Sequence, residues 1–565
     1  MQMQRGGGAT TTAATMAVMK LIRGFSSSVA NNSKIPKLRN IPWKYKPMAV
    51  KEARQALTDY LHSTRSLPYA YAENISNHSS LTLSAIISKL TFSPSSFSDS
   101  FRRYLRYHPI NEFEFFLESI GIDYHRLPSL LPHDKFFFSQ HRTPLHVAFH
   151  LSAFGFPWNR LGLLYTRCAS IFDSAPEEVD SRLELFKSYG FANTPLAGIC
   201  LAFPFLLGPP DPDGDVPGLF SDLKTLFLDF DLAASVPGNV DAWYQFCRKV
   251  RVFYDLGCRK GTLGELLGRS KHVFVDYSED SLLKKVDYFC RFCVGKEEVA
   301  LLLLQKPEIL SFDMETRVFS VGGLLEHFGL NAEELTSVSQ KYAHVMGRNK
   351  MANLPNVMRA MNLDEWFFQR LKDGDPQLLD TCAVEEDLDT KFRESLDKIR
   401  ASRTPVHTMN KLNFMLGVGF GENALTIKVL ANLHGTGSQL QERFDFLNRA
   451  GIGFSNLCMM VRTMPKILNQ KPEILEEKLT YLREEMNTSL EYLDTFPAFL
   501  NFNLENRIKP RYRFHAWLTE NGYCSTKYSI ASIIATSEKS FQARLRKIHP
   551  DAPKLWSKFC SAPAE

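Results

Sequence analysis

Four cations occupy every second position near the C-terminal end of the chain: Arg507, Lys509, Arg511 and Arg513. A helix that begins at Pro510, a residue favoured in the first turn, would hold Arg511 and Arg513 in that turn. Cations there are disfavoured by about 0.3 to 1 kcal/mol each. A bound phosphate would accept hydrogen bonds from the backbone N–H groups and the guanidinium groups together. The pattern predicts phosphate contacts; solvated side chains or pairing with acids are the alternative.

A second basic cluster follows the last helical pattern of the chain, which runs from Ile530 to Leu545. Its members are Arg544, Arg546 and Lys547. They would extend the same positive end, and a solvated terminal segment is the alternative interpretation. Phosphate contacts give affinity without sequence information. The seven cations therefore predict nucleic-acid binding but no particular base sequence.

A repeated apolar step organises the chain that carries these cations. The step has the pattern Pro-x-x-Leu, as in Pro497–Leu500, and related steps recur mostly at intervals of 32 to 36 residues. The prolines that begin them are Pro204, Pro237, Pro307, Pro376, Pro465 and Pro497. Steps without proline begin at Ala169, Lys271 and Ala343. A period of about 34 residues is typical of stacked helical units.

Each repeat has the same internal order. An apolar segment such as Val299–Leu304 comes first, and the proline that follows disfavours helix at the residue before it. After the step, a second segment has apolar residues three and four apart and ends near a glycine, as at Gly329 and Gly451. One unit cannot bury its own apolar face, so neighbouring units must stack. We predict an all-α solenoid of two-helix units with proline-terminated turns.

Length and composition agree with an extended array. The chain has 565 residues, of which 44% are hydrophobic and 23% charged, and this length exceeds what one compact core contains. Its longest apolar run, Pro195–Gly208, is shorter than the ~18 residues of a membrane-spanning candidate. We expect a soluble monomer without a membrane span.

The net charge of +6 is unevenly distributed. Residues 1–51 contain nine Lys or Arg and no acid, and residues 501–560 contain eleven Lys or Arg and four acids, a net charge of +7. Residues 52–500 carry a net charge of −9. Because the repeats are acidic and their C-terminal end is basic, that end is favoured as the contact with a polyanion.

The first 51 residues have the composition of an organelle transit peptide, since they are rich in Arg and Ser and lack acids. Met16–Ile22 could form a short amphipathic helix, and Arg23–Ser26 is similar to a mitochondrial processing site. We predict import into mitochondria and cleavage after Phe25, with the chloroplast as the alternative destination. A disordered basic tail is the other interpretation of this segment.

Five further segments are expected after the transit peptide. Residues 52–100 should form a helix and a Ser-rich linker, and residues 101–380 a first repeat array. The charged segment 381–410 interrupts the repeat and indicates an insertion or a hinge. Residues 411–550 should form a second array with the basic end, and residues 551–565 a tail.

Catalytic and metal-binding patterns are absent from the sequence. Gly417–Gly421 lacks the spacing of a dinucleotide-binding loop, and Gly264–Lys271 is one residue short of a P-loop. Cys290 and Cys293 form a C-x-x-C pair without a second pair or a nearby His at the spacing of a zinc ribbon. We therefore predict no enzyme activity, no cofactor and no metal site.

Three features together resemble the mitochondrial transcription termination factor (mTERF) family in its plant-type version. They are the Pro-x-x-Leu steps, the segment Tyr107–Phe113 and the segment Leu504–Arg513. The resemblance covers roughly residues 100–550. It implies a left-handed helical solenoid whose concave, positively charged face holds nucleic acid in organelles. The acidic repeats of this chain depart from that pattern.

The function expected from the cations and the resemblance is regulation of mitochondrial gene expression, in transcription termination or RNA processing. The protein would bind double-stranded DNA or RNA without turnover. The alternative is an acidic helical-repeat scaffold for protein partners, with the basic end tethering it to a nucleoid or a ribosome. A pentatricopeptide-type RNA reader is a further alternative, against which the proline-centred step argues.

Overall fold

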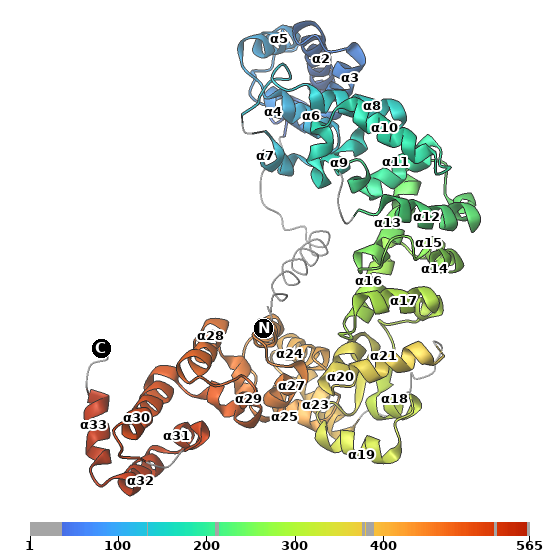
Figure 1. Ribbon diagram of the computed structural model, residues 1–565. Coiled ribbons are helices and arrows are strands. Elements are labelled where there is room, and N and C mark those ends of the chain that lie inside the picture. The colour runs from blue at the N-terminus through green and yellow to red at the C-terminus, as the bar shows by residue number, and fades with distance from the viewer. Residues whose placement is uncertain are drawn as a thin grey trace, which may run out of the picture. The chain divides into compact units, whose positions relative to one another are not determined.

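The computed structural model describes residues 37–132, 134–209, 214–375, 379, 389–524 and 528–561. The chain divides into two compact units between Arg251 and Val252. Within each unit, short helices follow one another in chain order, as Figure 1 shows. The all-α helical-repeat class predicted from the sequence is confirmed. The predicted cleavage site after Phe25 and the step at Pro376 lie outside the described residues.

The N-terminal unit begins with a bundle in which three helices pack against α2. The helices of this unit, up to the one that crosses the division, are α2 (Lys46–Asp59), α3 (Tyr69–His78), α4 (Ser80–Ile87), α5 (Phe97–Tyr107), α6 (Glu112–Ser119), α7 (Leu127–Leu130), α8 (Thr143–Phe154), α9 (Leu161–Arg167), α10 (Pro176–Lys187), α11 (Asn193–Ala202), α12 (Val216–Lys224) and α13 (Val240–Asp255). Helix α2 packs against α3, α4 and α5, and α3 packs against α6. The helix expected near Lys51 is therefore α2, the centre of this bundle.

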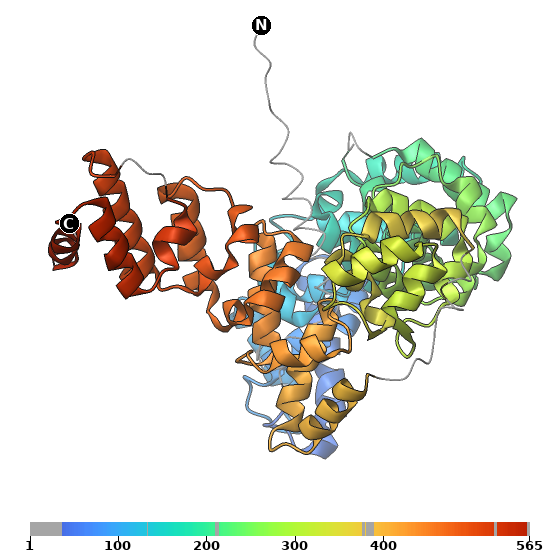
Figure 2. The ribbon, with the colours of Figure 1, turned by 90° about the horizontal axis from the view of Figure 1, so that it is seen from below.

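The C-terminal unit continues the array to the basic end, whose helices are red in Figure 2. Its first half contains α14 (Gly264–Arg269), α15 (His272–Asp276), α16 (Glu279–Cys290), α17 (Lys296–Gln305), α18 (Val321–His327), α19 (Ala332–Lys341), α20 (Leu354–Ala360) and α21 (Asp364–Asp373). Its second half contains α23 (Thr390–Arg400), α24 (Pro405–Gly417), α25 (Ala424–Leu430), α26 (Gly437–Arg449), α27 (Phe454–Thr463), α28 (Pro472–Thr480), α29 (Tyr492–Thr495), α30 (Lys509–Glu520), α31 (Ile530–Ile534), α32 (Glu538–Ile548) and α33 (Ala552–Ser561).

Two short strands were not expected. Strands β1 (Val318–Ser320) and β2 (Arg348–Lys350) pair antiparallel, with Phe319 opposite Asn349. Asn349 is buried, and its side-chain amide donates to the carbonyls of Leu416 and Phe420 at 3.3 and 2.9 Å. Within the described residues, this small sheet ties α18 to the loop after α24.

Five of the predicted steps form 3₁₀ turns of recurring geometry. These turns are η5 (Ala169–Asp173), η6 (Pro204–Leu206), η9 (Pro307–Ser311), η11 (Pro465–Asn469) and η13 (Pro497–Asn501). The residue before each turn has φ between −121° and −151° and ψ between 64° and 75°. That conformation ends the preceding helix. Two apolar side chains then enter the core, as Ile467 and Leu468 do with no exposed surface.

Cations from a preceding helix support three of these turns. Each donates a hydrogen bond to the carbonyl of the last apolar residue of a step: Arg182 to Leu207 (2.6 Å), Arg443 to Leu468 (2.8 Å) and Lys478 to Leu500 (2.7 Å). The donor precedes its acceptor by 25, 25 and 22 residues. Carbonyls at a helix end lack an intrahelical donor, so these side chains satisfy groups that the turn leaves free. A cation at this spacing is a structural part of the repeat.

Three segments differ from what the sequence pattern predicts. The turn expected at Pro237 forms earlier, as η8 (Leu232–Ser235), and Pro237 lies in the loop before α13. In the segment expected as a charged insertion, α23 packs against α24 and α25 and buries Phe392. Residues expected as a tail form α33, which buries Trp556 against α30 and α32. In the last two cases apolar residues spaced for one helical face outweigh the local charge.

Candidate nucleic-acid interface

Arg511 is buried inside the C-terminal unit, and both of its Nη atoms have partners there. Its side chain is 5% exposed, and its Nη1 donates to the carbonyls of Ile534 and Thr536 at 3.2 and 2.6 Å. Its Nη2 forms an ion pair with Glu538 at 2.6 Å. The guanidinium also lies over the ring of Phe541, 4.5 Å from the ring centroid. All of these contacts hold α30 against the end of α31 and the start of α32.

The acceptors of Arg511 belong to a repeat step that lacks proline. The segment Ala531–Ile534 begins 34 residues after Pro497, and Ile533 and Ile534 are buried. The carbonyls of residues 534 and 536 lie 23 and 25 residues after Arg511. This spacing matches the one found for Arg182 and Arg443. Arg511 is thus the turn-supporting cation of the last repeat.

Arg507 contributes to the same support. Its Nε donates to the carbonyl of Ile534 at 2.9 Å, and its Nη2 donates to those of Ala535 and Thr536 at 3.1 and 2.9 Å. Burial, followed by the nearby charge of Arg511, lowers the pKa of Arg507. Two guanidinium groups therefore complete one helix end, which is the negative pole of the helix dipole. These bonds use the donors that the sequence pattern assigned to phosphate.

The helix that carries these cations does not begin at Pro510. A π-helical turn, η14 (Leu504–Ile508), runs directly into α30, and Asn503 caps it by accepting the N–H of Asn506 at 2.7 Å. The N–H of Lys509 is bonded to the carbonyl of Leu504. Free backbone N–H groups therefore precede Arg511 by more than one turn. The helix start predicted at Pro510 is therefore wrong, while phosphate contact by Arg511 and Arg513 stays a prediction.

Lys509 and Arg513 lie beside Tyr481. Lys509 pairs with Glu505, and its Nζ lies 5.8 Å from the centroid of the Tyr481 ring. Arg513 is exposed and forms a side-chain hydrogen bond with Tyr481. Burial raises the pKa of Tyr481, and the charge and hydrogen bond of Arg513 partly offset the rise. Arg513 is thus a surface cation that is bonded to Tyr481.

The second basic cluster also contains both a cation bonded within the fold and cations at the surface. Arg544 is half-buried, donates to the carbonyl of Ser532 and lies 5.1 Å from the centroid of the Tyr528 ring. Arg546 and Lys547 are exposed. Within the part of the chain that the structure describes, neither of these two has a side-chain bond to another residue. The cluster therefore contributes one cation to the fold and two to the surface.

Helix α32 carries its free cations on one face. Arg546 and Lys547 follow Lys539 by seven and eight residues. This spacing places all three on the side of the helix opposite the buried Phe541 and Leu545. Lys539 is exposed and was absent from the predicted set. Its spacing from Arg546 is the signal that identifies it. We name these three residues the α32 basic face.

Comparison with known proteins agrees with this architecture. The mTERF family model matches residues 244–363 and 402–542. The chain is 49% identical over 544 residues to transcription termination factor MTEF18, mitochondrial, of Arabidopsis thaliana, and the match covers 95% of this chain and 98% of the relative. The chain belongs to the mTERF family. This mTERF chain is also 23% identical over 239 residues to transcription termination factor MTERF8, chloroplastic, of the same plant, over 41% of the chain and 44% of that relative.

Family membership confirms the resemblance seen in the sequence and places the protein among the regulators of organellar gene expression. The nearly full-length match to a mitochondrial relative confirms the predicted mitochondrial localisation. Every described helix is too short or too polar to cross a membrane. Among the described residues, His, Cys, Asp and Glu side chains do not gather in threes as a metal site requires. In the predicted C-x-x-C pair, Cys290 is half-buried and Cys293 is exposed.

Proposed function

We propose that this mTERF-family protein acts in the termination of mitochondrial transcription or in RNA processing by binding double-stranded nucleic acid. The names of both relatives, which are transcription termination factors, support this function. It would work by occupying its target, without turnover. The contact would be made by the α32 basic face together with Arg513.

The observation that carries the proposal is how the cations of the C-terminal end are divided. Residues 501–560 have a net charge of +7, while Arg507, Arg511 and Arg544 donate to backbone carbonyls. The three cations of the α32 basic face remain exposed. Phosphate neutralisation by exposed Lys and Arg supplies sequence-independent affinity and releases counterions. Arg511 and Arg507 would act indirectly, because they hold α31 and α32 in place.

Salt dependence of duplex binding tests this proposal. Affinity of the full chain for a fluorescein-labelled duplex of 25 base pairs would be measured by anisotropy between 50 and 300 mM KCl. Arg546→Glu with Lys547→Glu should weaken binding at least tenfold and make the slope of log K against log salt shallower by about two, because each lost phosphate contact removes about one unit. An unchanged slope in this variant would show that the α32 basic face does not contact phosphate.

A matched control keeps the charge change equal. The control is Lys428→Glu with Lys466→Glu. Both residues are exposed cations of the same unit, in α25 and η11. This double variant also changes the charge by four but leaves α32 intact. It should bind the duplex within about twofold of the wild-type chain at equal salt, since only contacted cations release counterions. Equal loss in both variants would indicate a response to net charge alone.

A protein scaffold is the second candidate function. It is favoured by the acidic body of the chain, because residues 52–500 carry a net charge of −9. A nucleoid or ribosomal protein with a basic surface would then bind the repeats, and the basic end would act as a tether. Partners that stay bound after nuclease treatment of a mitochondrial extract, and that the Arg546→Glu, Lys547→Glu variant still captures, would support this candidate.

A further inference from the structure

A second basic region lies at the start of the N-terminal unit. Residues 37–110 contain eleven Lys or Arg and four acids, a net charge of +7. The rest of this unit, residues 111–251, contains eleven Lys or Arg and seventeen acids, a net charge of −6. The family model begins only at residue 244. We name residues 37–110 the N-terminal basic region; it lies outside the segment that defines the family.

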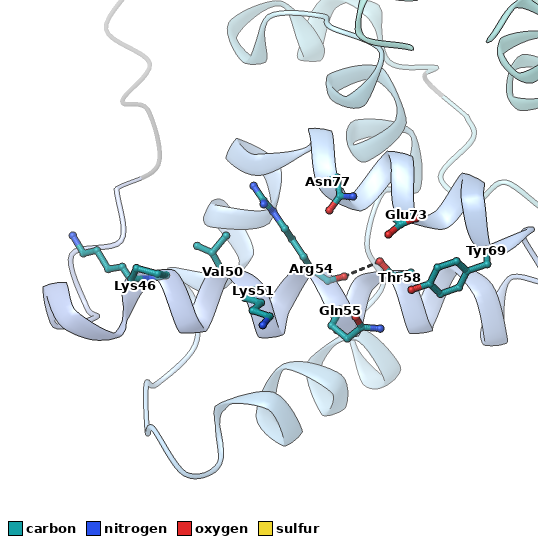
Figure 3. A pocket seen from close by; sticks show the side chains of 10 residues that line it. Lys46, Val50, Lys51, Arg54, Gln55, Thr58, Tyr69, Glu73 and Asn77 are labelled. Carbon is teal, nitrogen blue, oxygen red and sulfur yellow. Dashed lines mark hydrogen bonds between the residues drawn. The ribbon is translucent and has the colours of Figure 1, made fainter. Parts of the chain in front are cut away.

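A groove of about 520 Å³ runs between α2 and α3 in this region. Residues four apart on each helix line it, as Figure 3 shows: Val50, Arg54 and Thr58 on α2, and Tyr69, Glu73 and Asn77 on α3. Lys46 and Lys51 extend the lining along α2. The lining thus contains three cations and one carboxylate. Its charge suits an anion, and its length along α2 suits an extended chain.

Arg54 is the fixed cation of this groove. Its Nη2 donates to the hydroxyl of Ser80 at 3.1 Å, which holds the guanidinium between α2 and α4. Its Nε is buried and has no acceptor among the described residues. A buried donor without a partner costs free energy that a bound acceptor would recover. The side chain also lines the groove, where its positive charge attracts a phosphate.

A second hollow of similar volume, about 520 Å³, lies on the other side of α2 against α5. Arg65, Arg102 and Arg106 line it, beside Tyr107. Arg65 is held by an ion pair with the buried Glu112, and Arg102 pairs with Asp59 at 3.1 Å. Arg106 is exposed, and no side-chain partner binds it within the described chain. Both sides of α2 therefore present cations to solvent.

Exposed aromatic rings accompany these cations. Trp43, Tyr69 and Tyr107 are 86%, 47% and 71% exposed. Trp43 lies in η1 (Trp43–Tyr45), directly before α2, and Tyr69 and Tyr107 line the two hollows. Tyr69 and Tyr107 thus share the two hollows with the cations, and the exposed Trp43 precedes α2, so all three rings are open to a ligand in this region. Aromatic rings between cations are the arrangement that binds unpaired bases and their phosphates.

We propose that the N-terminal basic region binds single-stranded nucleic acid. The cations of α2 and α5 bind phosphates, and Trp43, Tyr69 and Tyr107 stack on bases. Single strands fit because bases in a duplex do not offer their faces to side chains. An acidic peptide would explain the cations but leaves the exposed rings without a role. This site is independent of the proposed duplex contact on α32.

Removing two rings without changing the charge tests the stacking. Affinity of the full chain for fluorescein-labelled U15 and dT15 oligonucleotides, and for the labelled duplex, would be measured by anisotropy. Trp43→Ala with Tyr107→Ala should weaken oligonucleotide binding at least tenfold, in line with the stacking of one or two bases, and leave duplex binding unchanged. Tyr523→Ala, which removes an exposed ring of the C-terminal unit, is the control and should bind both ligands as the wild-type chain does.

Reversing two cations tests the phosphate contacts. Lys51→Glu with Arg106→Glu should weaken U15 binding at least tenfold at 100 mM KCl and make its salt slope shallower by about 1.4, since single strands release about 0.7 counterion per contact. The matched control is Arg126→Glu with Lys224→Glu. These two cations are exposed in the same unit and lie outside the basic region. This control should stay within twofold of the wild-type affinity.

Two results would overturn the proposal. If the ring variant binds U15 as tightly as the wild-type chain while the charge variant loses U15 and a labelled poly-glutamate peptide equally, the region is an acidic-peptide site. If only Arg546→Glu with Lys547→Glu removes U15 binding, single strands bind at α32 instead. Loss of duplex binding alone in that variant would leave this proposal intact. The two proposals therefore fail separately.

Discussion

The two basic ends of this chain have equal net charge but use their cations differently. Residues 37–110 and residues 501–560 each carry +7. At the C-terminal end, Arg507 and Arg511 are bonded to the carbonyls after α31. In the N-terminal basic region, Lys51 and Arg106 are exposed, and the surrounding surface also exposes aromatic rings. Local charge density alone therefore does not identify the cations that can meet a ligand.

The position of a cation within the repeat decides its availability. A cation on a second helix that precedes a turn by 22 to 25 residues reaches the carbonyls of that turn, as Arg443 and Arg511 do. The α2 to α5 region shows a different pattern, because its helices pack as a bundle around α2. There Arg65 and Arg102 are paired with acids. In each region, a cation that is bonded within the fold can therefore be compared with an exposed one.

The largest effect is expected for Arg65→Met. Its partner Glu112 has no exposed side-chain surface, and its carboxylate also accepts the N–H of Phe138 at 2.7 Å. Burial raises the pKa of Glu112, against the lowering effects of that N–H and of Arg65. Without Arg65 a buried carboxylate loses its counter-charge, which costs about 3 to 5 kcal/mol. Hydrogen exchange of α2 and α6 peptides would measure this loss as a lower free energy of local opening.

Arg106→Met is the matched comparison in the same hollow. Arg106 is exposed, so its loss should change the free energy of local opening by less than about 0.5 kcal/mol. Arg65→Met should weaken folding of the bundle, whereas Arg106→Met should weaken only oligonucleotide binding. Equal exchange rates in the two variants would show that the Arg65–Glu112 pair does not stabilise the bundle.

A smaller loss is expected for Arg511→Met at the other end. The change leaves the carbonyls of Ile534 and Thr536 without this donor, while Arg507 still reaches both. The variant loses the hydrogen bonds of a charged donor, and such bonds contribute about 1.5 to 3 kcal/mol. Hydrogen exchange of α31 and α32 peptides should show this loss. Arg546→Met, on the exposed face of α32, should leave the same peptides within about 0.5 kcal/mol of the wild-type chain.

At the C-terminal end, duplex binding distinguishes a cation that stabilises the fold from one that contacts phosphate. Arg546→Met should lower affinity at low salt and preserve stability, because the side chain faces solvent. Arg511→Met should lower stability, and binding of the folded fraction should retain the wild-type salt slope. If Arg511→Met made the salt slope shallower by about one with unchanged hydrogen exchange, Arg511 would be a phosphate contact as the sequence pattern predicts.

The repeat, and with it the fold class, could be predicted because proline has a strong local effect. Proline ends the preceding helix wherever Pro204, Pro307, Pro465 or Pro497 occurs, and the two apolar residues that follow are buried there. Steps without proline are weaker signals, and Ala531–Ile534 has only its spacing and two isoleucines. If that step is overlooked, the carbonyls that accept hydrogen bonds from Arg511 are not recognised. The cation then appears free when it is not.

The helix start before Arg511 is a second reason why the site could be predicted only in part; the overlooked step is the first. Pro510 normally indicates a helix start, but here the π-helical turn η14 leads into it without a break. A π turn widens the helix locally, so a proline without an N–H is tolerated next to it. The α32 basic face was partly predicted, since Arg546 and Lys547 belong to the second cluster. Lys539 can be assigned to this face only when the bounds of α32 are known, because it lies seven residues before Arg546.

Lys478 offers a pH-dependent test of a turn-supporting cation. It is 3% exposed, and burial lowers its pKa to about 8, against the raising effect of Glu477. The unfolded chain holds this proton up to about pH 10.5, so it binds more protons than the folded chain between the two values. Stability should therefore rise with pH across this window relative to Lys478→Met, by at most about 1.4 kcal/mol per pH unit. Urea unfolding at pH 7, 8, 9 and 10 measures the difference, and a constant difference would mean that Lys478 keeps an ordinary pKa.

Among the residues bonded within the fold, a small effect is expected for Glu538→Gln, because the carboxylate is 54% exposed although its partner Arg511 is buried. Exposed partners of an ion pair contribute little, so the loss should stay below about 1 kcal/mol. Burial alone would raise the pKa of Glu538, but hydrogen bonds from Arg511, Trp556 and Gln542 lower it below the ordinary 4.5. The stabilisation is therefore present above pH 4.5 and disappears as the pH falls through the lowered value. Hydrogen exchange of α32 at pH 6 should distinguish the variant from the wild-type chain slightly, and urea unfolding at pH 3 should not. A loss as large as that of Arg511→Met would show that the ion pair, and not the carbonyl bonds, holds the last turn.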